Sequence, residues 1–484
     1  MAEDIYDKLS NPLALSVFIL TLLVPVGVGL LALLRTRNQS DFFIGGRAMN
    51  SFVVGLSAVS SGRSSWLVLG VSGMAYVSGV GAIWAIAGYT LVEAWQFIYL
   101  GRRLRKETQR MDSITLLDYF ESRFNDPTRL LRITGVIIMT IFITAYVAAQ
   151  FNAGAKSLST ALDIPVILSL ALAGLLIMVY MVLGGYVAVA YNDVVRALIM
   201  LTGLVVLPVV GIINIGGPVV MVEMISSLNP AHIDFFALGA GVIIGFIGIG
   251  LGSPGQPHMV VRYMSIDDPA RLKYSAIFGT CWNIILGIGA VSIGLIGRIL
   301  VPDPVRLPGG DPEMIYLVLS SDYFGPVLYG LLVGGVFAAI LSTADSQLLV
   351  VASTFVRDLY EKVIARKKVI SEKQKLRLSR IVVIFSGLLA MVLAYMAEEL
   401  VFWLVLFAWG GLGAAFGPAL IMSLFWKGST KEGIAAGMIT GAMISIGWYL
   451  WLKEPTGIYE LIPAFPGSLL AIVAVSLATR SKSR

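Results

Sequence analysis

The sequence predicts an all-α integral membrane protein with about thirteen transmembrane helices. Of its 484 residues, 57% are hydrophobic and only 13% are charged, whereas about a quarter of the residues of a soluble domain are charged. Apolar runs of roughly 20 residues, the length that crosses a bilayer core of about 30 Å, recur along the whole chain. Lys and Arg collect in every second connection between these runs, as expected when one side faces the cytoplasm.

The apolar runs can be taken in order from the N-terminus. The first follows an acidic, polar segment, so we expect a retained helix and not a cleaved signal peptide. Ten of the runs are nearly continuous, whereas Gly, Ser, Thr or Pro residues interrupt the second, seventh and ninth. The expected spans are 13–34, 51–78, 80–100, 129–158, 164–184, 190–215, 235–256, 273–300, 325–356, 379–397, 399–425, 432–452 and 460–479.

An odd number of spans places the two termini on opposite sides of the membrane. The basic connections, such as GRRLRKETQR (101–110) and VVRYMSIDDPARLK (260–273), fall on one side, and the loop 216–234 on the other side is nearly free of Lys and Arg. The positive-inside rule therefore predicts a plasma (inner) membrane protein with its N-terminus outside and its C-terminus in the cytoplasm. No linker divides residues 1–484, so we expect one transporter domain, with a core at about 51–425 and peripheral helices at about 13–34 and 432–479.

Several function classes receive no support from the composition. The net charge of +6 resides in loops on one side, which indicates topology and not nucleic-acid binding. One Cys and two His residues are too few for a disulfide framework or a histidine-rich metal centre. HExxH, GxSxG and P-loop patterns are absent from the sequence, so we expect neither an enzyme nor an organic cofactor. The expected partners are a lipid bilayer and a small solute, and the sequence assigns no oligomeric state.

Two spans contain residues that favour unwinding of the helix. Span 2 includes SAVSSGRSSWLVLG (57–70), whose Ser and Gly residues have poor helix propensity, and span 7 includes FIGIGLGSPGQPHMV (246–260). Within a bilayer, backbone unwinds only where protein or water satisfies the freed groups. The two breaks lie five spans apart, and this odd offset inverts the second copy. The pattern predicts inverted repeats with a binding site at the breaks.

A third segment, FAAILSTADSQLLV (337–350) in span 9, predicts a cation site. Its residues Ala339, Ser342, Thr343 and Ser346 share one helical face by their i, i+3, i+4, i+7 spacing. Two adjacent hydroxyls and a backbone carbonyl offer oxygen lone pairs without a formal charge, which suits a hard monovalent cation. The alternative is that the hydroxyls only bond to carbonyls of their own helix.

Four motifs in this order and spacing are together highly specific: LLDYFESRF (116–124), GGYVAVAYNDVVRALIM (184–200), GQPHMVVRYMS (255–265) and LSTADSQLLVVAS (341–353). Across almost the whole chain, the sequence resembles the sodium:solute symporters, and among them the sodium/proline symporter branch. The resemblance implies a five-plus-five inverted-repeat, LeuT-like core of spans 2 to 6 and 7 to 11, with discontinuous helices 2 and 7 and with spans 1, 12 and 13 outside it. It also implies sodium-coupled symport of a small organic solute, such as proline or a related carboxylate, by alternating access.

The resemblance assigns roles to individual residues. It places the sodium ion, the only metal expected, at the carbonyls of Ser60, Arg63 and Ala339 and at the hydroxyls of Ser342 and Thr343, the last three of which the cation face had already selected. Asp193 matches an acidic residue near the inner sodium path. The positions implied for the solute are Ser64, Ser65 and Trp66 in span 2, Tyr146 in span 4, and Ile249, Ser253 and Gln256 at the span 7 break.

The chain departs from the proline branch at four of these positions or beside them. That branch carries Asp where this chain has Gly62, an apolar residue where it has Arg63, and aromatic residues where it has Ile249 and Ser253. Because those aromatic residues form part of the proline pocket, the differences point away from proline itself as the solute.

Arg63 requires a partner, because a charge near the bilayer centre costs roughly 2.5 to 3.5 kcal/mol on insertion scales. The candidates are Glu93, Asp193 and Asp345. Asp345 is favoured because it stands about 60° around its helix from Ser342, and so borders the cation face and the ion path.

Three roles for Arg63 remain open. Its permanent charge would allow it to replace the bound cation, which would give a sodium-independent transporter or exchanger. It would also allow bidentate binding of a solute carboxylate, or an ion pair that tunes gating. A membrane sensor and a channel are alternatives from other classes. Gln256 and His258 are expected to have structural roles at the second break.

Overall fold

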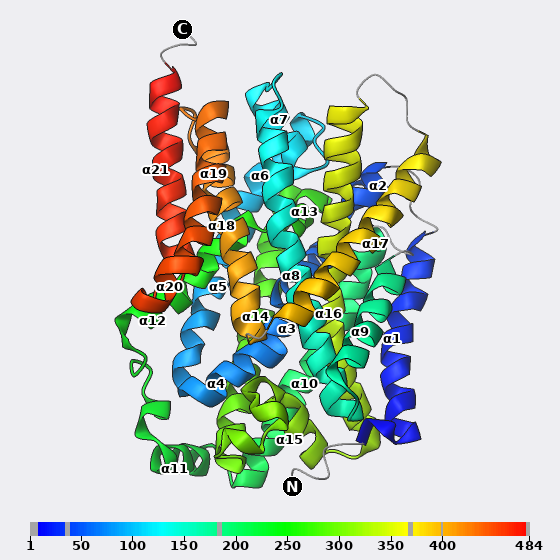
Figure 1. Ribbon diagram of the computed structural model, residues 1–484, viewed down its shortest axis with the longest axis vertical. Helices are drawn as coiled ribbons and strands as arrows, with labels where there is room; N and C mark the ends of the chain where they lie inside the picture. Colours follow the sequence, from blue (N-terminus) through cyan, green and yellow to red (C-terminus); the bar gives the residue numbers. More distant parts are fainter. Residues whose placement is uncertain (1–7, 34–38, 182–185, 366–370, 398–399, 481–484) are drawn as a thin grey trace.

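The structure, a computed structural model, describes residues 8–33, 39–181, 186–365, 371–397 and 400–480. Within these ranges the chain is helical apart from short connections, and the one β-type contact is an isolated bridge between Met49 and Ile266. Most of the long helices run along the long axis of the molecule (Figure 1). The all-α membrane architecture predicted from the composition is confirmed.

Each of the thirteen predicted spans coincides with helix. In the described residues, 9 helices are long and apolar enough to cross a membrane, and the bent pair Gly239–Gly255 and Pro257–Ser265 would make a tenth. The longest helical stretch, Ser51–Arg110, consists of several successive helices and contains two predicted spans. Two further spans correspond to the shorter apolar helices Pro12–Pro25 and Val166–Leu176. Residue 34, residues 182–184 and residue 399, at the ends of predicted spans, lie outside the described residues.

The first half of the core begins with the discontinuous helix of span 2 and ends with a long helix that carries Asp193. Its elements are α3 (Ser51–Ser65), η3 (Trp66–Val71), α4 (Ser72–Ser78), α5 (Ile83–Trp95), η5 (Gln96–Leu100), α6 (Gly101–Arg110), α7 (Leu116–Phe124), α8 (Leu130–Leu162), α9 (Val166–Met181) and α10 (Tyr186–Ile215).

The second half begins with the discontinuous helix of span 7. Its elements are α12 (Gly239–Gly248), η7 (Ile249–Gly255), α13 (Pro257–Ser265), α14 (Leu272–Leu300), α15 (Ile315–Tyr323), α16 (Pro326–Ser353), η12 (Thr354–Ile364), α17 (Glu372–Met396) and α18 (Val401–Phe425). Outside the core lie α1 (Pro12–Leu33), α19 (Lys431–Gly447) and α21 (Leu461–Arg480). The predicted loop 216–234 contains an additional short helix, α11 (Pro218–Leu228).

The discontinuous helices lie inside the bundle. α3 packs against α10, α14 and α16, and η7 packs between α5 and α18. At η7 the approach is so close that a Cβ on Gly250 would lie 2.2 Å from the carbonyl oxygen of Gly88 in α5. Such contact explains why a glycine-rich segment interrupts span 7, because any side chain would force the two elements apart.

One end of the core is closed by the segment between α14 and α16. Glu313 accepts hydrogen bonds from the backbone N–H groups of Val401 and Phe402, both at 2.8 Å, and so caps the N-terminus of α18. Lys156 of α8 forms ion pairs with Glu313 at 3.5 Å and with Asp311 at 2.8 Å. A short loop segment thereby connects α8 to α18 at the end opposite to the one where α21 terminates (Figure 1).

Candidate functional site

The first break lies at Ser64, inside the segment 57–70 that the sequence predicts to unwind. Ser64 has φ 50° and ψ −167°, a conformation rare for a residue with a side chain, and the helix resumes after it as a π-helical turn. Strained backbone of this kind persists only where its surroundings impose it, and it concentrates at functional sites. The carbonyl of Arg63 accepts the N–H of Trp66 across the break.

The predicted cation face of α16 meets the last turn of α3 before this break. The Ser342 hydroxyl donates to the carbonyls of Ser60 (3.1 Å) and Ala339 (2.9 Å). The Thr343 hydroxyl donates to the carbonyl of Ser61 at 2.9 Å. The structure therefore brings together Ser60, Ala339, Ser342 and Thr343, all fully buried. Neutral oxygen atoms from two elements converge here, so the hydroxyls do more than bond to their own helix.

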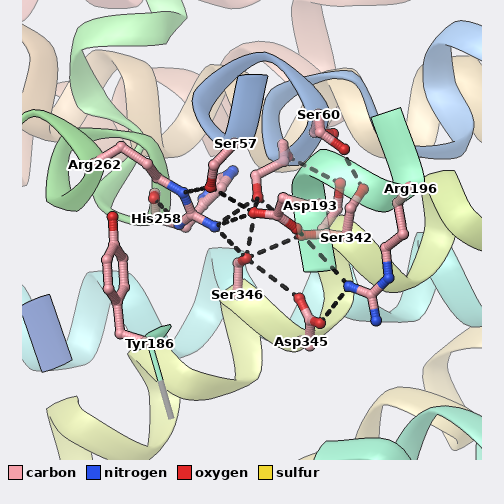
Figure 2. Close-up of polar contacts among 12 residues, drawn as sticks. Ser57, Ser60, Tyr186, Asp193, Arg196, His258, Arg262, Ser342, Asp345 and Ser346 are labelled. Atoms are coloured by element: carbon pink, nitrogen blue, oxygen red, sulfur yellow. Dashed lines mark hydrogen bonds and ion pairs between the residues drawn. The ribbon is translucent and has the colours of Figure 1, made fainter. Parts of the chain in front are cut away.

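A buried arginine, Arg262 of α13, contacts residues that lie one helical turn from the cation face. Its guanidinium donates to the carboxylate of Asp193 (2.9 Å), to the hydroxyls of Ser61 and Ser346 (both 2.6 Å) and to that of Ser57 (3.1 Å). Arg262 thus joins α13 to α3, α10 and α16 (Figure 2). Ser57 precedes Ser60 by about one turn and Ser346 follows Ser342 by one turn. The arginine therefore lies between the cation face and the end of the bundle that carries the basic loops.

Asp345 has a different partner from the one predicted. Arg196 of α10 binds its carboxylate at 2.5 Å and approaches Asp193 at 3.8 Å. Figure 2 shows the two arginines, Arg262 and Arg196, on opposite sides of Asp193 and Asp345. Both predicted ion-path carboxylates are consequently neutralised by arginine in this conformation.

Arg63 is paired with Glu93 of α5, and the preference for Asp345 was wrong. The Arg63 guanidinium donates to the Glu93 carboxylate and lies over the ring of Tyr89, 3.7 Å from its centroid. Asn283 of α14 donates to the same carboxylate at 2.8 Å, and Ser253 of η7 does so at 3.4 Å. Periodicity on α16 could not reveal this pair, because Glu93 approaches from a different helix.

The geometry also narrows the three roles considered for Arg63. A guanidinium that replaced the cation would have to contact the Ser342 and Thr343 hydroxyls, which instead bond to backbone carbonyls. Bidentate binding of a solute carboxylate would need two N–H groups along one edge of the Arg63 guanidinium, and Glu93 already occupies part of the guanidinium. The ion pair is the role that this conformation displays.

The sodium:solute symporter family model matches residues 42–441. The chain belongs to this family. The osmoregulated proline transporter OpuE of Bacillus subtilis (strain 168) is 34% identical over 476 residues, covering 98% of this chain and 95% of that protein. The high-affinity proline transporter PutP of the same organism is 35% identical over 462 residues, covering 94% and 96%. These relatives are transporters and not enzymes.

Solved structures agree with the fold. The substrate-bound outward-open state of a Na+-coupled sialic acid symporter aligns with a TM-score of 0.79 at 20% identity, over 96% of this chain and 98% of that one. The crystal structure of MhsT in complex with L-phenylalanine aligns with a TM-score of 0.54 at 15% identity, over 87% and 97%. The five-plus-five, LeuT-like architecture that the family resemblance implies is therefore confirmed.

The residues that family resemblance assigns to the solute surround the two breaks. Ser65 bonds to Gln150 of α8 through its hydroxyl at 3.0 Å, and Trp66 stacks on Phe402 of α18. Tyr146 is fully buried and packs edge-on against His258. At the second break, the amide of Gln256 donates to the carbonyls of Gly252 (3.1 Å) and Trp409 (3.0 Å). These two bonds agree with the structural role expected of Gln256, and its assignment to the solute stays a prediction.

The same region contains functional candidates that sequence reasoning missed. Arg262 was counted among the basic residues of a cytoplasmic connection, but α13 continues span 7 to Ser265 and buries it. Its position shortly after QPH, in the second turn of the helix that begins at Pro257, was the available signal. Asn283 and Ser253 gave no signal as partners of Glu93, because only the packing of α5, η7 and α14 brings them together.

Proposed function

We propose that this protein is a secondary active transporter that carries a small organic solute together with sodium by alternating access. The observation that carries the proposal is the convergence of the Ser342 and Thr343 hydroxyls on the backbone carbonyls of the broken helix α3. A sodium ion needs several oxygen lone pairs to replace its hydration shell, as carbonyl rings do in channels. A buried site of neutral oxygen atoms supplies these lone pairs. Such a site carries a net positive charge only when the ion is bound.

Four groups that lie together in the structure fit this ion: the carbonyls of Ser60 and Ala339 and the hydroxyls of Ser342 and Thr343. The carbonyl of Arg63, which the family resemblance adds, accepts one N–H and retains a second lone pair. Sodium is a substrate of this cycle, and no organic cofactor is required. The side chain of Arg63 takes no part in holding the ion.

Alternating access requires a barrier on each side of the site that can open. On the side of the basic loops, we propose the contacts of Arg262 with Asp193, Ser57 and Ser346 as that barrier. A small cavity of about 30 Å³, lined by Arg262, Ser346 and Tyr186, lies against it. On the other side, the hydrogen bonds of Glu313 tie the loop to α18, and the stacking of Trp66 on Phe402 ties η3 to α18.

The proposed solute is an amino acid or a related carboxylate, since the relatives named above are proline transporters. We place it at the first break, near Ser64, Ser65, Trp66 and Tyr146, and against η7. The proposed location is the plasma (inner) membrane, with the C-terminus in the cytoplasm and the N-terminus outside. This orientation is supported by the basic loops and by α1 beginning and α21 ending at opposite ends of the bundle (Figure 1).

Thermal unfolding of the purified protein tests the ion site. Because a ligand that binds only the folded state stabilises it by mass action, we expect a higher unfolding temperature in sodium chloride than in potassium chloride. The Ser342→Ala/Thr343→Ala variant should lose this difference. The control is Thr202→Ala, which removes an exposed hydroxyl bonded to its own helix. Equal stabilisation of the unmodified protein by both salts would contradict the proposal.

A further inference from the structure

The Arg63–Glu93 pair lies in the wall of the proposed solute site. Arg63 directly precedes the break residue Ser64, and Ser253, which the family resemblance assigns to the solute, bonds to Glu93 at 3.4 Å. Asn283 completes the group from α14 at 2.8 Å. All four side chains are at most 1% exposed. Four separate elements, α3, α5, η7 and α14, therefore converge on one polar cluster at the proposed solute site.

This cluster has hydrogen-bonding capacity that the protein does not use. Among the described residues, the Arg63 Nε, the Tyr89 hydroxyl and the Asn283 Oδ1 are buried without a hydrogen-bond partner. Nearby, the indole N–H of Trp66 and the amide nitrogen of Gln150 are also unpartnered. Buried polar groups are nearly always bonded to protein, water or ligand. Donors and an acceptor are thus available to a bound molecule, and leaving them unpaired costs free energy.

Stability alone gives a weak reason for this arrangement. A buried ion pair contributes little net stability relative to apolar side chains of the same volume, because both charges must be desolvated. Selectivity gives a stronger reason. A site built to hydrogen-bond a polar group discriminates strongly against an analogue that lacks it, because the polar groups of the site are then left unpaired.

We propose that Arg63 and Glu93 form the selectivity element of the solute site, and that the solute is an amino acid whose side chain carries a hydrogen-bonding group. The carboxylate lies at the break, toward Trp66 and Gln150, and the polar side group faces Arg63 Nε, Tyr89 and Asn283. Glu93 acts as a positioning residue, because it orients the guanidinium and cancels its charge. This inference rests on the proposed function, since it assigns the solute of the same site.

Two matched pairs of amino acids test the proposal: L-proline with trans-4-hydroxy-L-proline, and L-valine with L-threonine. The members of each pair differ mainly in one hydroxyl. Dissociation constants are measured from thermal-shift titrations of the full-length protein, in sodium and in potassium. We expect the hydroxyl member of at least one pair to bind ten-fold or more tightly. The variant Arg63→Met/Glu93→Gln removes both charges together, and in it this preference should fall to about three-fold or less. The control variant Arg271→Gln/Asp267→Asn, which removes an exposed ion pair, should retain the preference.

The outcomes separate this inference from the proposed function. Sodium-dependent binding without a hydroxyl preference in the unmodified protein would overturn the inference and leave the function standing, and this result needs no variant to fold. A preference that persists in the double variant would also overturn it, as would failure of all four compounds to bind. A hydroxyl preference that is lost in Arg63→Met/Glu93→Gln, but that is the same in sodium and in potassium, would support the inference and contradict sodium coupling.

Discussion

Removal of the Arg262 side chain should destabilise the protein, because the buried carboxylate of Asp193 then loses its ion pair. In Arg262→Met, Asp193 loses its ion pair at 2.9 Å and retains the hydroxyls of Ser57 (2.6 Å) and Ser61 (3.0 Å), with Arg196 3.8 Å away. Breaking a buried pair on one side typically costs about 3–5 kcal/mol. Because Arg262 also holds Ser346 and the carbonyl of His258, we expect a value within this range.

The decisive comparison is with the double variant Arg262→Met/Asp193→Asn. Its neutral amide no longer carries an unpaired charge, and it can still bond to the Ser57 and Ser61 hydroxyls. Residues in one network couple by about 0.5–3 kcal/mol, so the double variant should recover about 2 kcal/mol of the loss. In thermal unfolding of the purified variants, the protein with two substitutions should therefore melt at a higher temperature than Arg262→Met alone.

The single variant Asp193→Asn completes the cycle, because it leaves the Arg262 guanidinium without its carboxylate. If the double variant melts lower than either single variant, by the sum of the two losses, the side chains act independently. That result would refute the network as the closed barrier beside the cation face.

Two further predictions concern the end of the core that the loop between α14 and α16 closes, and the second break. Burial raises the pKa of Glu313 from its ordinary value of 4.5 to about 7, against the lowering influence of Lys156 and of the N–H groups of Val401 and Phe402. The folded state therefore holds this proton more tightly than the unfolded state, so stability should fall as pH rises from about 4.5 to 7. The fall should be smaller in Glu313→Gln, measured by thermal unfolding across that range. Gly250→Ala should destabilise the protein by about 1–3 kcal/mol through overpacking, because its Cβ would meet Gly88, whereas Gly241→Ala meets nothing within 4 Å and should be tolerated. Equal effects of the two alanines would show that α5 and η7 have room to separate.

Much of the fold was accessible from sequence because it depends on local patterns. Apolar length predicted helix at each span within the described residues. The Gly, Ser and Pro residues located both breaks, the first of which contains the positive φ of Ser64. The face of Ala339, Ser342 and Thr343 followed from helical periodicity alone. These features need no knowledge of which helices are neighbours.

The charged contacts were less predictable, because they depend on packing between helices distant in sequence. Arg63 faces α5 and not α16, so its partner is Glu93 and not Asp345. The apolar pattern ends span 7 at residue 256 and so places Arg262 in the basic connection that follows, whereas α13 carries it into the bundle toward Asp193. A charged side chain therefore indicates the end of a span only where the fold offers it no buried partner of opposite charge.

Solute uptake driven by a sodium gradient tests the central claim most directly. Proteoliposomes that contain the purified protein are given an inward sodium gradient and labelled trans-4-hydroxy-L-proline or L-proline. The account predicts accumulation above the external concentration for at least one of them, abolished when potassium replaces sodium and in Ser342→Ala/Thr343→Ala. Accumulation that is unchanged in potassium, or only equilibration of the solute, would contradict it.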